Sequence, residues 1–108
     1  MIQTGCENVY PREVEEVLYE HPAVVEVAVV GAPDPKWGEK VVAVVCLRPG
    51  AEASEAELIA FTRERIASYK KPKHVVFIET LPKNASGKVL KRELRDAIAS
   101  GEVLLGGD

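Results

Sequence analysis

Two valine-rich segments, residues 23–30 and 41–47, do most to constrain how this 108-residue chain folds. Runs of β-branched residues of this length are typical of strands buried in a sheet. Residues 31–40 between them are rich in proline and glycine and show no helical pattern. A parallel pair would need a long crossover connection, so the two segments are predicted to pair as antiparallel strands.

Three helices are expected around this pair. Pro11 suits the first turn of a helix, because that turn does not need the missing N–H, and Pro22 would end the helix. Ser54 with Glu57 forms a capping box for a second helix. Residues 89–99 carry apolar side chains at helical spacing and predict a third helix.

A further apolar segment, residues 74–79, lies between the second and third helices and predicts a third strand. The resulting order is helix, strand, strand, helix, strand, helix. Three strands cannot close into a barrel, so we expect an α+β fold, a two-layer sandwich in which a small three-stranded sheet is covered by helices on one side. Residues 1–108 are expected to form one domain, since a chain of this size has room for one modest core.

The composition argues against several classes of protein. With 46% hydrophobic and 29% charged residues, it is ordinary for a globular domain and argues against disorder. No apolar run approaches the roughly 20 residues of a membrane-spanning helix, and no signal peptide is visible. Cys6 and Cys46 lie far apart, so we expect a cytoplasmic protein without a disulfide framework or a zinc site. Aromatic residues are few (6%) and do not alternate with basic ones, which argues against nucleic-acid binding.

The charge distribution is more informative than the net charge of −3. Residues 1–35 contain seven acidic residues and one basic residue, a net charge of −6. Residues 69–95 contain eight basic and two acidic residues, a net charge of +6. This separation indicates either a local site for an anionic ligand or two solvated faces of opposite sign, and the pattern alone leaves both interpretations open.

A polar segment before the third predicted helix is the strongest candidate for a site. Residues 81–95 read Leu-Pro-Lys-Asn-Ala-Ser-Gly-Lys-Val-Leu-Lys-Arg-Glu-Leu-Arg. Gly87 tolerates a positive φ and permits a tight turn, which would hold Lys88 at a loop tip near a helix N-terminus. A lysine there could neutralise a phosphate or a carboxylate, although an exposed lysine on a turn would give the same pattern. The glycine spacing is not that of a Walker phosphate-binding loop.

The same segment resembles the last core motif of the adenylate-forming superfamily, which includes the acyl-CoA synthetases. Residues 5–15, Gly-Cys-Glu-Asn-Val-Tyr-Pro-Arg-Glu-Val-Glu, are similar to the motif next to the hinge in that family. Residues 30–42 and 69–72 fit the intervening segments. The four segments occur in the family's order and extend over nearly the whole chain. The chain therefore resembles the C-terminal domain of an AMP-binding acyl-CoA synthetase, in particular a fatty-acid-CoA ligase.

The resemblance implies an enzyme that uses ATP to convert a carboxylic acid, expected to be a fatty acid, to an acyl-adenylate and then transfers the acyl group to coenzyme A. In that family the corresponding region is a mobile domain, and a large N-terminal adenylation domain holds ATP, Mg²⁺ and the acid. That domain is the expected partner, and the isolated chain is expected to be inactive. The alternative is a free-standing interaction or regulatory module with the same fold.

The resemblance also implies roles for individual residues. Lys88 matches the lysine that bridges carboxylate and phosphate oxygens during adenylation, so it is the expected catalytic residue. After the domain rotates, the loop of Gly5, Cys6 and Glu7 is expected to help form the pantetheine tunnel, although Cys6 stands where the family more often has glycine. The other expected ligand-binding residues are Gly87 and Lys70, and no metal ligand is expected within this chain.

A few remaining residues have less specific expectations. His21 and His74 flank structural elements and are expected to be structural, and Cys46 is expected in the core. Lys91 and Arg92 could meet phosphates of coenzyme A or belong to the solvated surface.

Overall fold

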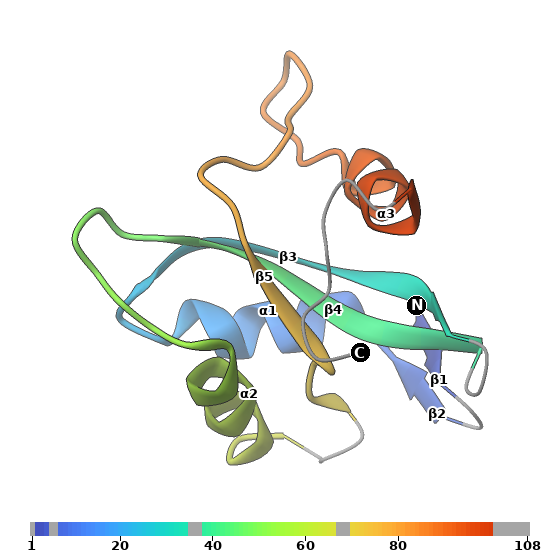
Figure 1. Cartoon of the computed structure of the whole chain (residues 1–108), viewed down its shortest axis with the longest axis horizontal. Helices are drawn as coiled ribbons and strands as arrows, with labels where there is room; N and C mark the ends of the chain where they lie inside the picture. The colour runs from blue at the N-terminus through green and yellow to red at the C-terminus, as the bar shows by residue number, and fades with distance from the viewer. Residues whose placement is uncertain (1, 5–6, 35–37, 67–69, 101–108) are drawn as a thin grey trace.

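The computed structural model describes residues 2–4, 7–34, 38–66 and 70–100 (Figure 1). Its strands and helices follow the predicted order, with two additional short strands before the first helix. The bounds are β1 (Ile2–Thr4), β2 (Glu7–Val9), α1 (Pro11–Tyr19), β3 (Val24–Asp34), β4 (Gly38–Leu47), α2 (Glu55–Arg63), β5 (His74–Phe77) and α3 (Lys91–Ser100).

The hairpin of β3 and β4 forms the centre of the sheet. The two strands pair antiparallel from Val24↔Leu47 to Asp34↔Gly38, which confirms the predicted pairing. Both strands are longer than predicted, because the proline-containing segment after residue 30 continues in extended conformation. Pro33 is tolerated there since β3 is an edge strand, where a missing N–H on the outer side breaks no ladder bond.

The sheet extends on the other side of β4. There β5 pairs with β4 in parallel along His74–Phe77, and β1 joins β4 through Thr4↔Gly38. β2 pairs with β1, so the order is β2-β1-β4-β3, with β5 also on β4. The three expected strands are thus part of a five-stranded sheet. The sequence did not reveal β1 and β2, because strands of three residues are too short to show alternation.

Helices cover both faces of the sheet (Figure 1). Alternating residues of β3 separate into two clusters, in which Val27 and Val29 pack with α1 and α2, whereas Ala28 and Val30 pack with α3. The α+β sandwich is confirmed, but the expectation that helices lie on one side is corrected by α3. The reason lies in β4, where residues 41–46 are all buried, because a strand without a polar face needs cover on both sides.

The starts of α1 and α2 follow the sequence signals. Pro11 is the first residue of α1, and the Ser54 hydroxyl accepts the N–H of Glu57 at 3.0 Å at the start of α2. The Glu57 carboxylate contacts His21 Nε2 at 2.8 Å, so it ties α2 to the end of α1. Within the described residues, no helix is both long and apolar enough to cross a membrane.

Carboxylates from the helices accept hydrogen bonds from main-chain N–H groups at the outer edges of β3 and β5. On β3, Glu15 of α1 accepts the N–H of Val29 at 2.8 Å. On β5, Glu55 of α2 accepts the N–H of Val75 at 2.8 Å. Both contacts satisfy donors that point away from the sheet and that its ladders leave unpaired.

Candidate functional site

The segment around Lys88 forms a closed hairpin loop that projects from the α3 side of the sheet (Figure 1). Lys83 and Val89 face each other across an antiparallel bridge, and the N–H of Leu90 donates to the carbonyl of Pro82 at 2.8 Å. Leu81 is buried in the core beneath α3, which anchors the root of the loop. We refer to residues 83–89 as the Lys88 loop.

Asn84 organises the tip of the Lys88 loop. Its side-chain Oδ1 accepts three hydrogen bonds, from the Ser86 N–H at 3.0 Å, the Ser86 hydroxyl at 2.8 Å and the Lys88 N–H at 3.0 Å. Its N–H donates to the Lys88 carbonyl, and its own carbonyl accepts the N–H of Gly87, each at 3.0 Å. Asn84 was not among the residues predicted from the sequence, although an asparagine side chain often accepts the N–H two residues further on, here that of Ser86.

Lys88 is exposed on this loop, as the sequence predicts. Gly87 has φ +87°, and a Cβ built there would meet no atom within 4 Å, so backbone conformation rather than crowding requires glycine. α3 begins at Lys91, two residues later than predicted, so two residues separate Lys88 from the first residue of the helix. Among the described residues, none pairs with the Lys88 ammonium, which is therefore available to an anion.

Three ion pairs join the basic C-terminal segment to the acidic N-terminal segment. Lys70 contacts Glu13 at 2.7 Å, Lys91 contacts Glu15 at 2.7 Å, and Lys83 contacts Glu26. These contacts show that part of the charge separation in the sequence serves to join the two segments to each other. Neither of the two interpretations of the charge pattern included these pairs.

Lys70, an expected ligand-binding residue, and Lys91, for which both interpretations were open, are thus already engaged within the domain. Lys70 is half-buried against Glu13, and Lys91 reaches the carboxylate that also caps the edge of β3. Arg92, by contrast, is exposed on the first turn of α3.

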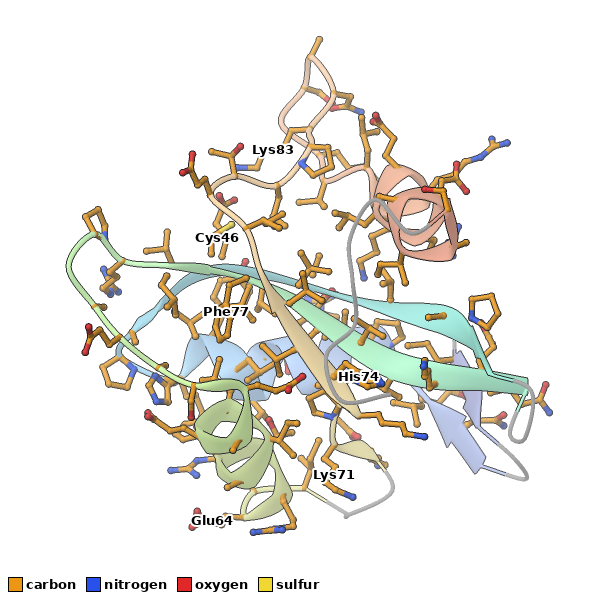
Figure 2. All side chains as sticks on the ribbon, in the orientation of Figure 1. Cys46, Glu64, Lys71, His74, Phe77 and Lys83 are labelled. Carbon is orange, nitrogen blue, oxygen red and sulfur yellow. The ribbon has the colours of Figure 1, made fainter. Side chains whose placement is uncertain are left out.

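Lys83 and Cys46 lie on the α3 side of the sheet (Figure 2). A hydrogen bond to Glu26 raises the pKa of Lys83, so its ammonium stays charged well above neutral pH. Burial raises the pKa of the Cys46 thiol, and the Glu26 carboxylate raises it further. The protonated, buried thiol is an unreactive core residue, as expected.

Both histidines are buried, His21 just after α1 and His74 at the start of β5. The His21 Nδ1 accepts the N–H of Ala23 at 3.1 Å, so Nε2 is the nitrogen that donates to Glu57. His74 is buried, with its Nδ1 3.9 Å from the carboxylate of Glu55. The positions fit the structural role that was expected for both residues.

Of the second group of predicted site residues, the structure describes Glu7 alone. Gly5 and Cys6 are outside the described residues, and Glu7 begins β2, paired with Thr4 of β1. Figure 1 shows the hairpin of β1 and β2 at one end of the sheet, well apart from the Lys88 loop. Glu7 therefore lies at a different part of the domain from Lys88.

The described residues contain no group of three or more histidine, cysteine, aspartate or glutamate side chains arranged to hold a metal ion.

Comparisons with known proteins agree closely with one another. The profile of the AMP-binding enzyme C-terminal domain family matches residues 13–88. The long-chain-fatty-acid–CoA ligase of Bacillus subtilis is 53% identical over 94 residues, which cover 87% of this chain and 17% of that protein. The 2-succinylbenzoate–CoA ligase of Bacillus cereus strain Q1 is 49% identical over 98 residues, which cover 91% of this chain and 20% of that protein.

The solved structures give the same result. The fatty acyl CoA synthetase of Mycobacterium tuberculosis superposes with a TM-score of 0.88 at 46% identity, covering 94% of this chain and 20% of that one. The chain thus spans no more than a fifth of the length of these relatives.

Proposed function

The chain belongs to the family of AMP-binding enzyme C-terminal domains, and from that premise we propose that it is the mobile C-terminal domain of an ATP-dependent acid–CoA ligase. The full enzyme would activate a carboxylic acid with ATP as an acyl-adenylate and then transfer the acyl group to coenzyme A. The partner of this chain would be an N-terminal adenylation domain in the same protein, and the protein would be cytoplasmic.

The observation that carries the proposal is Lys88 itself, which is exposed, pairs with none of the residues that the structure describes, and stands on a backbone that hydrogen bonds hold in place. During adenylation, negative charge accumulates on the carboxylate and on the oxygens around the α-phosphorus. A cation held at a fixed position stabilises that charge without reorganising as the reaction proceeds. Lys88 would supply this cation when its loop enters the active site of the adenylation domain.

The thioester step would use the other surface of the domain. Rotation would withdraw Lys88 and bring the loop of Gly5, Cys6 and Glu7 to the pantetheine tunnel. Lys70 could contribute there only through a rearrangement of its ion pair with Glu13. In such an enzyme the N-terminal domain would bind Mg²⁺, and no step proposed for this chain depends on it.

We propose a fatty acid as the substrate of the full enzyme. The fatty-acid ligases of B. subtilis and M. tuberculosis are 53% and 46% identical to this chain, which supports that class. Relatives of similar identity are named ligases of 2-succinylbenzoate and 4-chlorobenzoate. A panel of fatty and aromatic acids tested on the full-length protein would decide between these classes.

The Lys88→Ala variant of the full-length protein tests the proposal. We expect loss of acyl-adenylate formation by at least about 100-fold, measured as pyrophosphate release, because a single charge-stabilising group is typically worth that much. Thioester formation from supplied acyl-adenylate should be retained. Arg63→Ala is the matched control, since it removes one positive charge from the exposed surface of α2, on the opposite face of the sheet.

Two results would contradict the proposal. Equal loss in both half-reactions would refute the division of labour between the two surfaces. Acyl-CoA production by the 108-residue chain alone would show that no adenylation domain is needed.

A further inference from the structure

We propose that Asn84 is the residue that positions Lys88 for the adenylation step, an inference that rests on the proposed function. Asn84 binds the Lys88 main chain at two points, because its side chain accepts the Lys88 N–H and its own N–H donates to the Lys88 carbonyl. It also forms hydrogen bonds with Ser86 and Gly87, the two residues before Lys88. Asn84 thus fixes the direction in which the lysine side chain leaves the loop.

Packing holds the root of the loop but not its tip. Leu81 is buried in the core, Val89 packs against the same cluster, and Lys83 is tied to Glu26. Residues 83–88 are all exposed, and the space around Gly87 is open. The conformation of the tip therefore depends on the hydrogen bonds to Asn84 rather than on contact with the rest of the domain.

Loss of these bonds would act on the geometry of the reaction. Glycine has the largest conformational freedom of any residue, so the Ser86-Gly87 segment would sample many conformations without the Asn84 side chain. Lys88 would still reach the substrate, but it would occupy the productive position for a smaller fraction of the time. A misplacement of about 1 Å in a positioning group can cost on the order of 100-fold in rate.

The test is the Asn84→Ala variant of the full-length ligase, measured in each half-reaction. We expect kcat for pyrophosphate release to fall by about 10- to 100-fold, with KM for ATP and for the acid changed by less than about threefold. Thioester formation from supplied acyl-adenylate should be unchanged. Hydrogen exchange at the Lys88 amide should become faster, which reports the loss of loop order independently of activity.

Three further variants isolate the contact. Ser86→Ala removes only the hydroxyl bond to Asn84 and leaves both contacts with Lys88, so it should retain adenylation. Asn84→Asp keeps an acceptor oxygen at the same reach and should restore much of the rate. Asn84→Gln keeps the amide but moves it by one methylene, so it should lower adenylation as Asn84→Ala does. It serves as the test if Asn84→Ala does not fold.

The outcomes separate this inference from the proposed function. Full adenylation in Asn84→Ala, alongside its loss in Lys88→Ala, overturns the positioning role alone. Equal loss in both half-reactions would make Asn84 a general structural residue and also overturn it. Retention of adenylation in Lys88→Ala overturns the proposed function, and the positioning role with it.

Discussion

The β3–β4 hairpin and the Lys88 loop are both antiparallel turns of the chain, but different interactions hold them. The central hairpin has buried side chains on both faces, and helices from both halves of the sequence cover it. The tip of the Lys88 loop has exposed side chains, and its hydrogen bonds join residues at most four positions apart. One region is fixed by distant contacts and the other by local ones.

This difference separates stability from function within one small domain. Substitutions in the hairpin should change the free energy of unfolding, because they remove packing shared by several elements. Substitutions that only remove a side chain at the loop tip should change the reaction with little effect on that free energy, since no core contact is lost. The following predictions test whether the two properties can be changed separately.

The largest expected effect on stability is that of Val29→Ala in β3. Val29 is fully buried, so we expect a loss of roughly 2–3 kcal/mol in the free energy of unfolding, measured by urea denaturation. Val25→Ala, at a 41% exposed position of the same strand, is the matched control and should cost less than about 1 kcal/mol. Similar losses in the two variants would mean that burial does not govern the stability of the hairpin.

An intermediate effect is expected from Gly87→Ala. Its φ of +87° is costly for a residue with a Cβ, so the loss in stability should be about 1 kcal/mol. Gly50→Ala is a matched control, because Gly50 has φ +80° and equally open surroundings in the turn after β4. Both variants should lose similar stability, whereas only Gly87→Ala should lower adenylation. If Gly50→Ala lowered adenylation equally, the effect would be one of stability alone.

The smallest effect concerns the ion pair at the root of the loop. The hydrogen bond to Glu26 raises the pKa of Lys83 above 10.5, so the pair stabilises the fold fully below that pH. Its contribution is lost as the pH rises through the higher pKa of the folded state. In the Glu26→Gln variant, the free energy of unfolding should therefore fall less steeply above about pH 10.5. Urea denaturation at a series of pH values measures this dependence.

Glu16→Gln is the control for this prediction. Glu16 forms its ion pair with an arginine, Arg12, rather than with Lys83, so its loss should leave the pH dependence unchanged. If both variants changed the pH dependence of the free energy of unfolding in the same way, the effect would not come from Lys83.

Features that depend on a few neighbouring residues could be predicted from the sequence. Ser54 marks the start of α2, because its hydroxyl and the Glu57 N–H lie within one turn. The antiparallel pairing of β3 with β4 follows from the short connection between them. The exposure of Lys88 follows from the polar, glycine-containing segment around it.

Features that depend on distant residues could not be predicted. The sequence gives no sign that Glu15, on the first helix, meets both Val29 and Lys91.

The placement of α3 on the opposite face of the sheet could have been predicted, since residues 41–46 form an unbroken apolar run rather than an alternating one. The family resemblance pointed to Lys88 itself, but the role of Asn84 became visible only in the hydrogen bonds of the folded loop.

The carboxylates of Glu15 and Glu55 have a consequence for how this domain can contact other proteins. By occupying the N–H groups of Val29 and Val75, they remove sites where another chain could dock by strand addition. A domain that must repeatedly attach to and leave a larger body would be hindered by a sheet edge that binds passing strands. Contacts at β3 and β5 are thereby directed to side chains and loops, which could be broken and re-formed during the rotation that we propose for the domain.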